Sequence, residues 1–140
     1  MKILIDTNVI LDVLCARAGF VEASSAVWKL CEVNRAEGYI SALSVPNIVY
    51  ILRKELTPQR TGQIVEQITM IFGVIDLKGA DLKAAADMNV GDYEDALQMC
   101  QAKRIKADYI VTRNTGDYKD SKVPAVTPAE LLEKIREKTL

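Results

Sequence analysis

Short runs of Ile, Val and Leu alternate along this chain with longer segments whose apolar residues recur at helical spacing. This alternation constrains the fold most, because strands separated by helices run parallel in one sheet with helices on its faces. The sequence therefore predicts a single α/β domain over residues 1–140, a doubly wound parallel sheet flanked by helices. The predicted strands cover residues 2–6, 39–43, 74–77, 108–112 and 124–126, and the predicted helices begin near residues 7, 21, 44, 58, 80, 92 and 128.

Two kinds of residue mark where the predicted helices start and stop. Gly38 and Gly73 follow helical patterns and are predicted to end them. Thr57-Pro58 and Thr127-Pro128 are predicted to start helices, and the second of these belongs to a capping box with Glu130. No linker or internal repeat interrupts the pattern, which agrees with one domain.

The chain contains no histidine, and this absence narrows the chemistry open to it. It excludes Ser-His and Cys-His dyads, two-histidine ribonuclease mechanisms and zinc bound by imidazole. The three cysteines, Cys15, Cys31 and Cys100, lie in apolar helical patterns and are predicted to be buried free thiols. Hydrolytic chemistry in this chain is therefore expected to depend on carboxylates, hydroxyls, amines or a bound metal.

The start of the chain and its apolar runs bear on location. The sequence shows neither the apolar core of a signal peptide nor an apolar run long enough to span a bilayer. We therefore expect a cytoplasmic protein with no membrane partner. The net charge of −1 does not by itself indicate a nucleic-acid binder.

Acidic and amide side chains gather where predicted strands end. Asp6 ends the first strand, and Asn114 and Asp117 follow the fourth. Ligands of open α/β sheets bind outside the carboxyl ends of the strands, so these residues are the first candidates for a site. Asp92 and Asp95 lie three apart at the start of a predicted helix, on adjoining parts of one face. The favourable interaction of acidic residues with a helix N-terminus is a rival explanation for this second group.

Carboxylates gathered without basic neighbours repel one another, and a divalent cation resolves that conflict. Oxygen ligands without His or Cys favour Mg²⁺ or Mn²⁺. We therefore predict that Asp6 stands at the strand end because it is a metal ligand. The remaining acidic residues considered are interpreted as solvated or capping charges: Asp12, Asp76, Asp81 and Asp87.

These residues resemble the PIN-domain ribonucleases, and in particular the VapC-like toxins of bacterial toxin–antitoxin pairs. The resemblance rests on LIDTNVILDVL, ISALSVPNIVYILRK, DYEDALQMCQAKRIKADYIVTRN and the pair Asp117-Tyr118, and it covers nearly the whole chain. It implies a hydrolase, an endoribonuclease that cleaves RNA phosphodiesters with Mg²⁺ or Mn²⁺. It also implies a protein antitoxin as partner and a homodimer.

The resemblance also implies roles for individual residues. Metal ligands would be Asp6, Asp95 and Asp117, the same residues with Asp92 would be catalytic, and supporting roles would fall to Asn8, Asn47, Thr112, Asn114 and Glu94. The chain departs from the family pattern at two positions, where Asn47 replaces the usual glutamate and Asn114 the usual aspartate. Asp92 and Glu94 are candidates to compensate for the lost charge.

Substrate contacts are expected from basic and aromatic side chains. Arg53, Lys54 and Arg113 are candidates to bind RNA phosphates, and Tyr93 or Tyr118 is a candidate to stack on a base.

Two other functions stay open at this stage. The first is a PIN-fold module that binds RNA or assembles without cleaving, since two acidic positions of the family are lost. The second is an aspartate-based phosphatase or phosphoacceptor domain with Asp6 as nucleophile. The lysine that such a site needs is missing, because the fourth predicted strand ends in Thr112-Arg113-Asn114.

Overall fold

The sheet has its first strand at the centre. The structure, a computed structural model, describes residues 1–139, and within them five strands pair in parallel in the order β3-β2-β1-β4-β5. Their bounds are β1 (Lys2–Ile5), β2 (Glu37–Ser41), β3 (Gly73–Ile75), β4 (Tyr109–Val111) and β5 (Ala125–Val126). The chain extends the sheet to one edge through β2 and β3 and then to the other through β4 and β5. The predicted doubly wound parallel sheet is confirmed.

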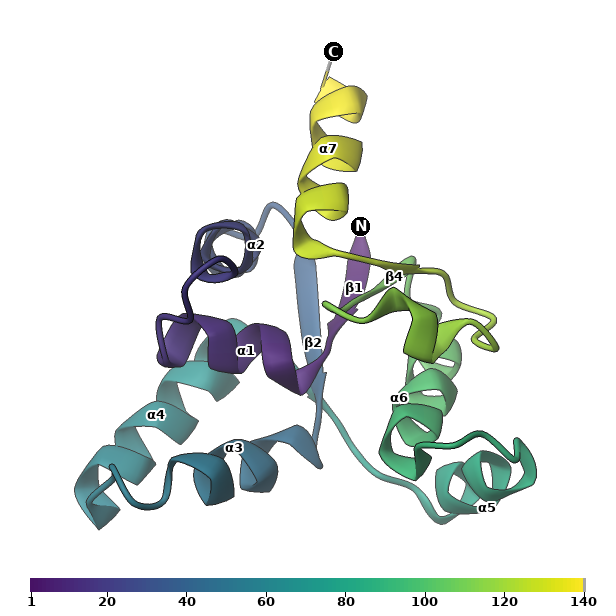
Figure 1. The fold of residues 1–140 in the computed structure, drawn as a ribbon, viewed down its shortest axis with the longest axis horizontal. Coiled ribbons are helices and arrows are strands. Elements are labelled where there is room, and N and C mark those ends of the chain that lie inside the picture. The colour runs from purple at the N-terminus through teal and green to yellow at the C-terminus, as the bar shows by residue number, and fades with distance from the viewer. Residues whose placement is uncertain (140) are drawn as a thin grey trace.

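Helices cover both faces of this sheet. They are α1 (Thr7–Leu14), α2 (Val21–Glu32), α3 (Ser44–Leu52), α4 (Pro58–Ile71), α5 (Gly79–Asp87), α6 (Tyr93–Arg104) and α7 (Pro128–Thr139), with a short 3-10 helix, η1 (Thr115–Tyr118). Figure 1 shows α1 to α4 on one side of the central strands and α5 and α6 on the other. The fold therefore has three layers.

The central strand shows how the sequence specifies these layers. Successive side chains of a strand point to opposite faces. Ile3 and Ile5 accordingly pack into the cluster that includes α1, α2 and α4, whereas Leu4 packs into the cluster on the side of α6. All three are buried, and full burial of such a side chain stabilises a fold by about 1.5–3 kcal/mol. The continuous apolar run of this strand is thus explained by burial on both faces.

The core between the sheet and helices α2 and α4 contains the one tryptophan of the chain. The rings of Trp28 and Phe72 meet edge to face, with centroids 5.0 Å apart. Both side chains are buried. Aromatic pairs in this geometry add about 0.5–1.5 kcal/mol beyond the area that they bury.

Two predicted helix starts are confirmed by their hydrogen bonds. The Thr57 hydroxyl accepts from the backbone N–H of Arg60 at 3.1 Å, with Pro58 in the first turn of α4. At α7, the backbone N–H of Glu130 donates to Thr127 Oγ1 at 3.1 Å, and Glu130 Oε1 accepts from the Thr127 N–H at 3.0 Å. This reciprocal pair is the capping box that the sequence predicts.

The predicted helix stop at Gly38 is wrong, because α2 ends at Glu32 and Gly38 lies in β2. The stop predicted at Gly73 is confirmed in position, since α4 ends at Ile71 with Phe72 as its C-cap, and Gly73 itself begins β3. The role of both glycines is close packing. A Cβ on Gly38 would lie 2.5 Å from Cys31 Sγ, and a Cβ on Gly73 would lie 2.6 Å from the ring of Tyr39. These contacts form only in the tertiary structure, so local sequence gives no sign of them.

The prediction for the cysteines is confirmed in one respect and wrong in another. All three are free thiols. Cys31 is buried, and burial raises its pKa to about 12. Cys15 is exposed, because it follows the last residue of α1 and lies outside the apolar face of that helix.

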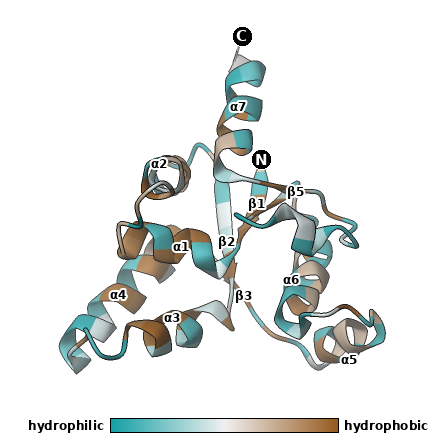
Figure 2. Cartoon of the chain, viewed as in Figure 1, coloured by the Kyte–Doolittle hydropathy of each residue, from teal (hydrophilic) through white to brown (hydrophobic). Residues whose placement is uncertain are grey.

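Hydrophobic residues are not all covered by the sheet. Figure 2 shows brown, hydrophobic segments along α1, α3 and α4. On α3 and α4, Tyr50, Ile51 and Met70 are at least half exposed. In the part of the chain that the structure describes, no helix is long and apolar enough to cross a membrane.

Candidate active site

The candidate site begins at the carboxyl ends of β1 and β4, where the order of strands reverses. These strands pair in parallel with Ile5 opposite Val111, so Asp6 and Thr112 leave the sheet side by side. The Thr112 hydroxyl donates to Asp6 Oδ2 at 2.8 Å, and both residues are buried. The pairing of two strands therefore fixes the first carboxylate of the site.

The Asp6 carboxylate does not cap α1, although Asp6 directly precedes that helix. Its side chain forms no capping hydrogen bond. Asp6 Oδ1 accepts instead from Gln98 Nε2 at 3.1 Å, while Oδ2 accepts from Thr112. Helix capping therefore does not explain this charge, which is only 8% exposed.

The first turn of α6 brings further carboxylates to the same edge. Asp92 caps the helix, since its Oδ1 accepts from the Asp95 backbone N–H at 3.1 Å. For Asp92, the rival explanation, a favourable interaction with the helix N-terminus, therefore applies. Asp95, which is half-buried, lines the same pocket as Asp6.

The carboxylates share one open pocket of about 320 Å³, which we call the acidic pocket. Among the described residues that line it are five carboxylates and no lysine or arginine. The lining residues that the sequence had singled out are Asp6, Asn8, Asn47, Asp92, Glu94, Asp95, Asn114 and Asp117. Segments far apart in the sequence thus converge on one site.

Burial and neighbouring negative charges raise the pKa of Asp95 to about 6. Burial is the largest cause, and the charge of Asp92 is the next. The charges of Asp6 and Asp117 raise the pKa further, whereas a hydrogen bond from Tyr118 lowers it. This carboxylate therefore lies in a field that favours a bound cation.

The donor set of the pocket fits a hard divalent ion. Within residues 1–139, no group of three His, Cys, Asp or Glu side chains is arranged to hold a metal ion by itself. The donors are nevertheless all oxygen, their charge is not balanced by a lysine or arginine in the lining, and Gln98 Oε1 is buried without a hydrogen-bond partner. Mg²⁺ keeps several waters and takes few carboxylates, so an open pocket suits it better than a closed cage.

Two side chains of the site were not assigned to it from sequence. Gln98 was missed, although it follows Asp95 by three residues and so shares its face of α6. Tyr118 was expected to stack on a base, and this is wrong because the side chain is buried, 2% exposed. Its hydroxyl donates to Asp95 Oδ1 at 3.1 Å and accepts from Gln98 Nε2 at 3.1 Å.

The expected supporting asparagines also lie at the pocket. Asn47 Nδ2 donates to Glu94 Oε2 at 3.4 Å, which links α3 to α6 across the opening. The Asn114 backbone N–H donates to Thr112 Oγ1 at 3.1 Å, so the loop after β4 folds back on the strand end. Asn8 Oδ1 accepts from Arg17 Nη1 at 3.4 Å.

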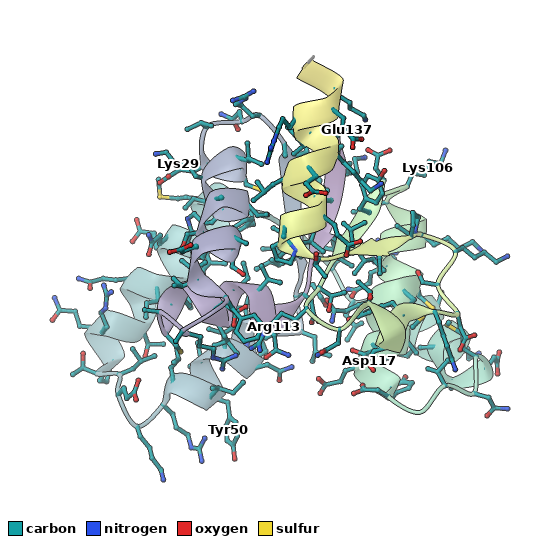
Figure 3. All side chains as sticks on the ribbon, turned by 45° about the horizontal axis from the view of Figure 1, so that its top comes forward. Lys29, Tyr50, Lys106, Arg113, Asp117 and Glu137 are labelled. Atoms are coloured by element: carbon teal, nitrogen blue, oxygen red, sulfur yellow. The ribbon has the colours of Figure 1, made fainter. Side chains whose placement is uncertain are left out.

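The expected RNA-binding residues are placed in different ways. Arg113 Nη2 lies 2.9 Å from Asp12 Oδ1, and its guanidinium covers the ring of Phe20, so it points toward α1 and away from Asp117 (Figure 3). Arg53 covers the ring of Tyr50 at 3.9 Å, beside the acidic pocket. Lys54 is exposed in the turn after α3.

Of the four carboxylates expected to be solvated or capping charges, two are buried, with Asp12 at 0% exposure and Asp81 at 5%. Asp12 is paired with Arg113, and Arg104 Nη2 donates to Asp81 Oδ2 at 2.9 Å. Burial raises the pKa of Asp81, but hydrogen bonds from Arg104 and from the Lys78 backbone outweigh it, and the pKa lies below its usual range. The bond from Lys78 also caps α5, as expected for a capping charge. Asp87 is exposed, and the Asp76 side chain is exposed beside Arg104.

Comparisons with known proteins agree with this geometry. A sequence model of the PIN domain matches residues 2–116. No curated protein sequence matches the chain. Similar solved structures include DNA-bound VapBC from Salmonella typhimurium, with a TM-score of 0.67, 19% identity, and coverage of 91% of this chain and 98% of that one.

Two further solved structures are similar to this chain. VapBC2 from Rickettsia felis, bound to a DNA fragment from its promoter, gives a TM-score of 0.66 at 14% identity over 91% of this chain and 98% of that one. A toxin–antitoxin complex from Klebsiella pneumoniae gives 0.66 at 18% identity over 89% and 96%. At such identities the likeness establishes a shared fold.

Proposed function

Because the chain belongs to the PIN-domain family, we propose that it is an endoribonuclease that hydrolyses RNA phosphodiesters with Mg²⁺ or Mn²⁺. The observation that carries this proposal is the acidic pocket, where five carboxylates meet without a lysine or arginine in the described lining. A structural cluster of that size would be expected to contain basic partners, because uncompensated carboxylates destabilise a fold.

We assign each side chain of the pocket a role from its position. Asp6, Asp95 and Asp117 would hold the ion, which supplies a water of lowered pKa and neutralises charge that develops on the phosphate. Thr112 orients Asp6 through its hydroxyl. Asp92 and Asp117 are exposed, so either carboxylate could accept a proton from a solvent water.

Glu94 supplies charge that the family pattern would place on α3. Asn47 stands where a glutamate is usual and carries no charge. Glu94 comes from α6, lines the same pocket and accepts a hydrogen bond from Asn47. We assign Glu94 the compensating role, so that exchanging the two residues, Asn47→Glu with Glu94→Asn, keeps more activity than Glu94→Asn alone.

RNA would enter along α3. Tyr50 is 64% exposed and lines the pocket, so it offers the stacking surface that the buried Tyr118 lacks. Arg53 and Lys54 lie beside it and would contact phosphates without reading sequence. Tyr93 is exposed, but its hydroxyl donates to the Leu82 carbonyl at 2.8 Å, outside the pocket. Arg113 is left out of this surface because it pairs with Asp12.

We extend the proposal to a cytoplasmic toxin of a bacterial toxin–antitoxin pair, acting as a homodimer. Support comes from similar structures described as a toxin–antitoxin complex and as VapBC proteins. The half-exposed apolar residues of α3 and α4 offer surface to a partner chain. Coexpression with the protein encoded next to it, followed by copurification and light scattering, would test both partners.

The decisive experiment is RNA cleavage by the purified protein in Mg²⁺ or Mn²⁺, with and without EDTA. Asp6→Ala and Asp95→Ala should each reduce the rate by about a hundredfold or more, since even residues that only support a metal ligand give 10–100-fold losses. Asp87→Asn, an exposed carboxylate on α5, is the matched control and should cleave normally. Cleavage that persists in EDTA or in the Asp6→Ala, Asp95→Ala double variant would refute the mechanism.

One rival is favoured by a specific observation. The asparagines at positions 47 and 114 lower the charge of the site, which suits a module that binds RNA without cleaving it. RNA binding at normal strength, together with no cleavage in any divalent ion, would favour this alternative. A phosphoacceptor function is not favoured, because no lysine is among the described residues lining the pocket around Asp6.

A further inference from the structure

Two neutral side chains connect the carboxylates of the acidic pocket. Gln98 Nε2 donates one hydrogen to Asp6 Oδ1 and the other to Tyr118 Oη, each at 3.1 Å. The Tyr118 hydroxyl then donates to Asp95 Oδ1, also at 3.1 Å. Asp6 and Asp95 are 89 positions apart by residue number, yet one amide and one hydroxyl link them.

The chemistry of the partners fixes the direction of every bond in this chain of contacts. A carboxylate only accepts, so the Gln98 amide must turn its NH₂ group, and not its oxygen, toward Asp6. With both N–H groups used, the tyrosine hydroxyl accepts from the amide and has its own hydrogen left for Asp95. The reverse orientation would bring the amide oxygen against the carboxylate. Gln98 Oε1 is accordingly left buried without a partner.

Burial restricts the movement of both donors, Gln98 and Tyr118. Gln98 is 6% exposed and Tyr118 is 2% exposed. The Tyr118 ring belongs to the core cluster that contains Leu4 of β1 and Met99 of α6. Tyr118 cannot turn to solvent without opening that core, and Gln98 is buried where it borders the acidic pocket.

From these contacts we infer that Gln98 and Tyr118 are positioning residues, which hold the Asp6 and Asp95 carboxylates in a fixed arrangement and leave their negative charge uncancelled. A lysine or arginine would also satisfy the carboxylates, but it would neutralise them and occupy the place of a cation. Neutral donors satisfy the same oxygens and keep the charge. The consequence for a divalent ion rests on the proposed function, whereas the arrangement itself does not.

A second buried glutamine on the same helix provides a matched control. Gln101 is 0% exposed and stands one turn further along α6. Its Nε2 donates to the backbone carbonyls of Ile75 and Asp76, and its Oε1 is likewise buried without a partner. Gln101 thus has the burial and bonding pattern of Gln98 without touching a carboxylate of the pocket.

The first test needs no metal. Nuclear magnetic resonance of the protein in EDTA should give two well-separated, slowly exchanging signals for the Gln98 side-chain NH₂ group. Tyr118→Phe should shift the signal of one of these hydrogens and leave the other nearly in place, and it should also shift the carboxyl carbon of Asp95. If the Gln98 hydrogens exchange as fast as those of exposed glutamines, the inference is wrong, whether or not the protein binds metal.

The second test measures Mn²⁺ affinity by calorimetry together with unfolding in EDTA. Gln98→Met and Tyr118→Phe should weaken Mn²⁺ binding by about 10–100-fold, the usual effect of losing a partner of a metal ligand. Gln98→Lys should abolish binding while the protein without metal unfolds at or above the wild-type midpoint. Gln101→Met should lower the unfolding midpoint and leave Mn²⁺ affinity unchanged.

The outcomes separate the two levels of the argument. Wild-type protein that fails to bind Mn²⁺ refutes the proposed function, and the resonance test still decides whether the arrangement exists. Wild-type binding that Gln98→Met and Tyr118→Phe leave intact refutes the positioning role alone. Equal losses in Gln98→Met and Gln101→Met would show that affinity follows stability, and this would also overturn the inference.

Discussion

Asp6 and Asp12 stand at the two ends of one short stretch, and the fold treats them in opposite ways. Both are buried, Asp12 at 0% exposure and Asp6 at 8%. Asp12 lies 2.9 Å from Arg113 Nη2 and 3.6 Å from Arg17 Nη1, and it also accepts from the Ser24 hydroxyl. Asp6 has only the neutral donors Thr112 and Gln98 among the hydrogen bonds of the described residues.

The difference teaches how to tell a structural carboxylate from a functional one in this fold. Burial alone does not separate them, since both side chains are out of water. The partner does, because an arginine cancels the charge of the carboxylate beside it, whereas a neutral donor forms a hydrogen bond and leaves the charge in place. The distinction is drawn within two consecutive residues, where Thr112 holds Asp6 and Arg113 holds Asp12.

The largest expected effect is the loss of stability when the structural carboxylate, Asp12, is removed. Asp12→Ala leaves two arginine side chains without their buried partner, and it should lower the free energy of unfolding by about 3 kcal/mol, the lower end of the range for a broken buried pair because both arginines are partly exposed. Urea denaturation followed by circular dichroism measures this. Asp120→Ala, at an exposed site, should change stability by less than about 0.5 kcal/mol. A similarly small loss in Asp12→Ala would break the comparison.

The next largest effect is expected at the acidic pocket, where a bound cation should stabilise the folded protein. Mn²⁺ at about 100 times its dissociation constant should raise the free energy of unfolding by about 2.7 kcal/mol, because only the folded chain holds the ion. Asp95→Asn should lose most of this gain, and Asp12→Asn should keep it. Thermal melts with and without EDTA provide the measurement. Equal stabilisation of wild type and Asp95→Asn would place the ion elsewhere.

A smaller effect is expected from pH. The folded-state pKa of Asp95 is raised to about 6, so its contribution to stability is fully present below the unfolded pKa near 3.8 and is lost as the pH rises toward 6. Partial exposure reduces the contribution to about 1 kcal/mol. In EDTA, Asp95→Asn should remove this part of the decline between pH 4 and 6. The pKa of Asp81 is lowered, so its contribution has the opposite sign and falls away only at more acidic pH.

The smallest expected effect is a gain in stability when a carboxylate of the acidic pocket loses its charge. Asp117 is exposed, and its charge helps to raise the pKa of Asp95. Asp117→Asn should therefore stabilise the protein without metal by a few tenths of a kcal/mol, in line with surface substitutions, while weakening Mn²⁺ binding. Thermal melts in EDTA and calorimetry report the two quantities. A variant that is clearly less stable than wild type would show that Asp117 has a structural role.

The parts of the fold set by local pattern were predictable. Burial on both faces makes β1 a continuous apolar run, and the side-chain caps at Thr57 and Thr127 involve residues at most three positions apart. The meeting of Asp6, Asp92, Asp95 and Asp117 in one pocket could also be expected, because parallel strands of an α/β sheet end at one edge. These predictions need only the local pattern of residues, their spacing and the direction of the strands.

What could not be predicted depends on contacts across the fold. Gly38 is a glycine because a helix sulfur lies where its Cβ would be. Tyr118 reads as a surface aromatic in a polar loop, and only the packing of η1 against the sheet buries it. Asp12 and Arg113 are 101 positions apart, so no local signal marks them as partners. Gln98 had a local signal, its spacing from Asp95, but glutamine carries no charge to draw attention to it.

The edge-to-face pair of Trp28 and Phe72 has a practical consequence for all of these measurements. Intrinsic fluorescence excited at long wavelength comes from the one tryptophan, and that indole is buried in the core cluster that includes α2 and α4, whose residues do not include those of the acidic pocket. The fluorescence emission should change when the core unfolds, and it should stay constant when the pocket binds a proton or a cation. The chain thus has a built-in optical probe that distinguishes unfolding from events at the site.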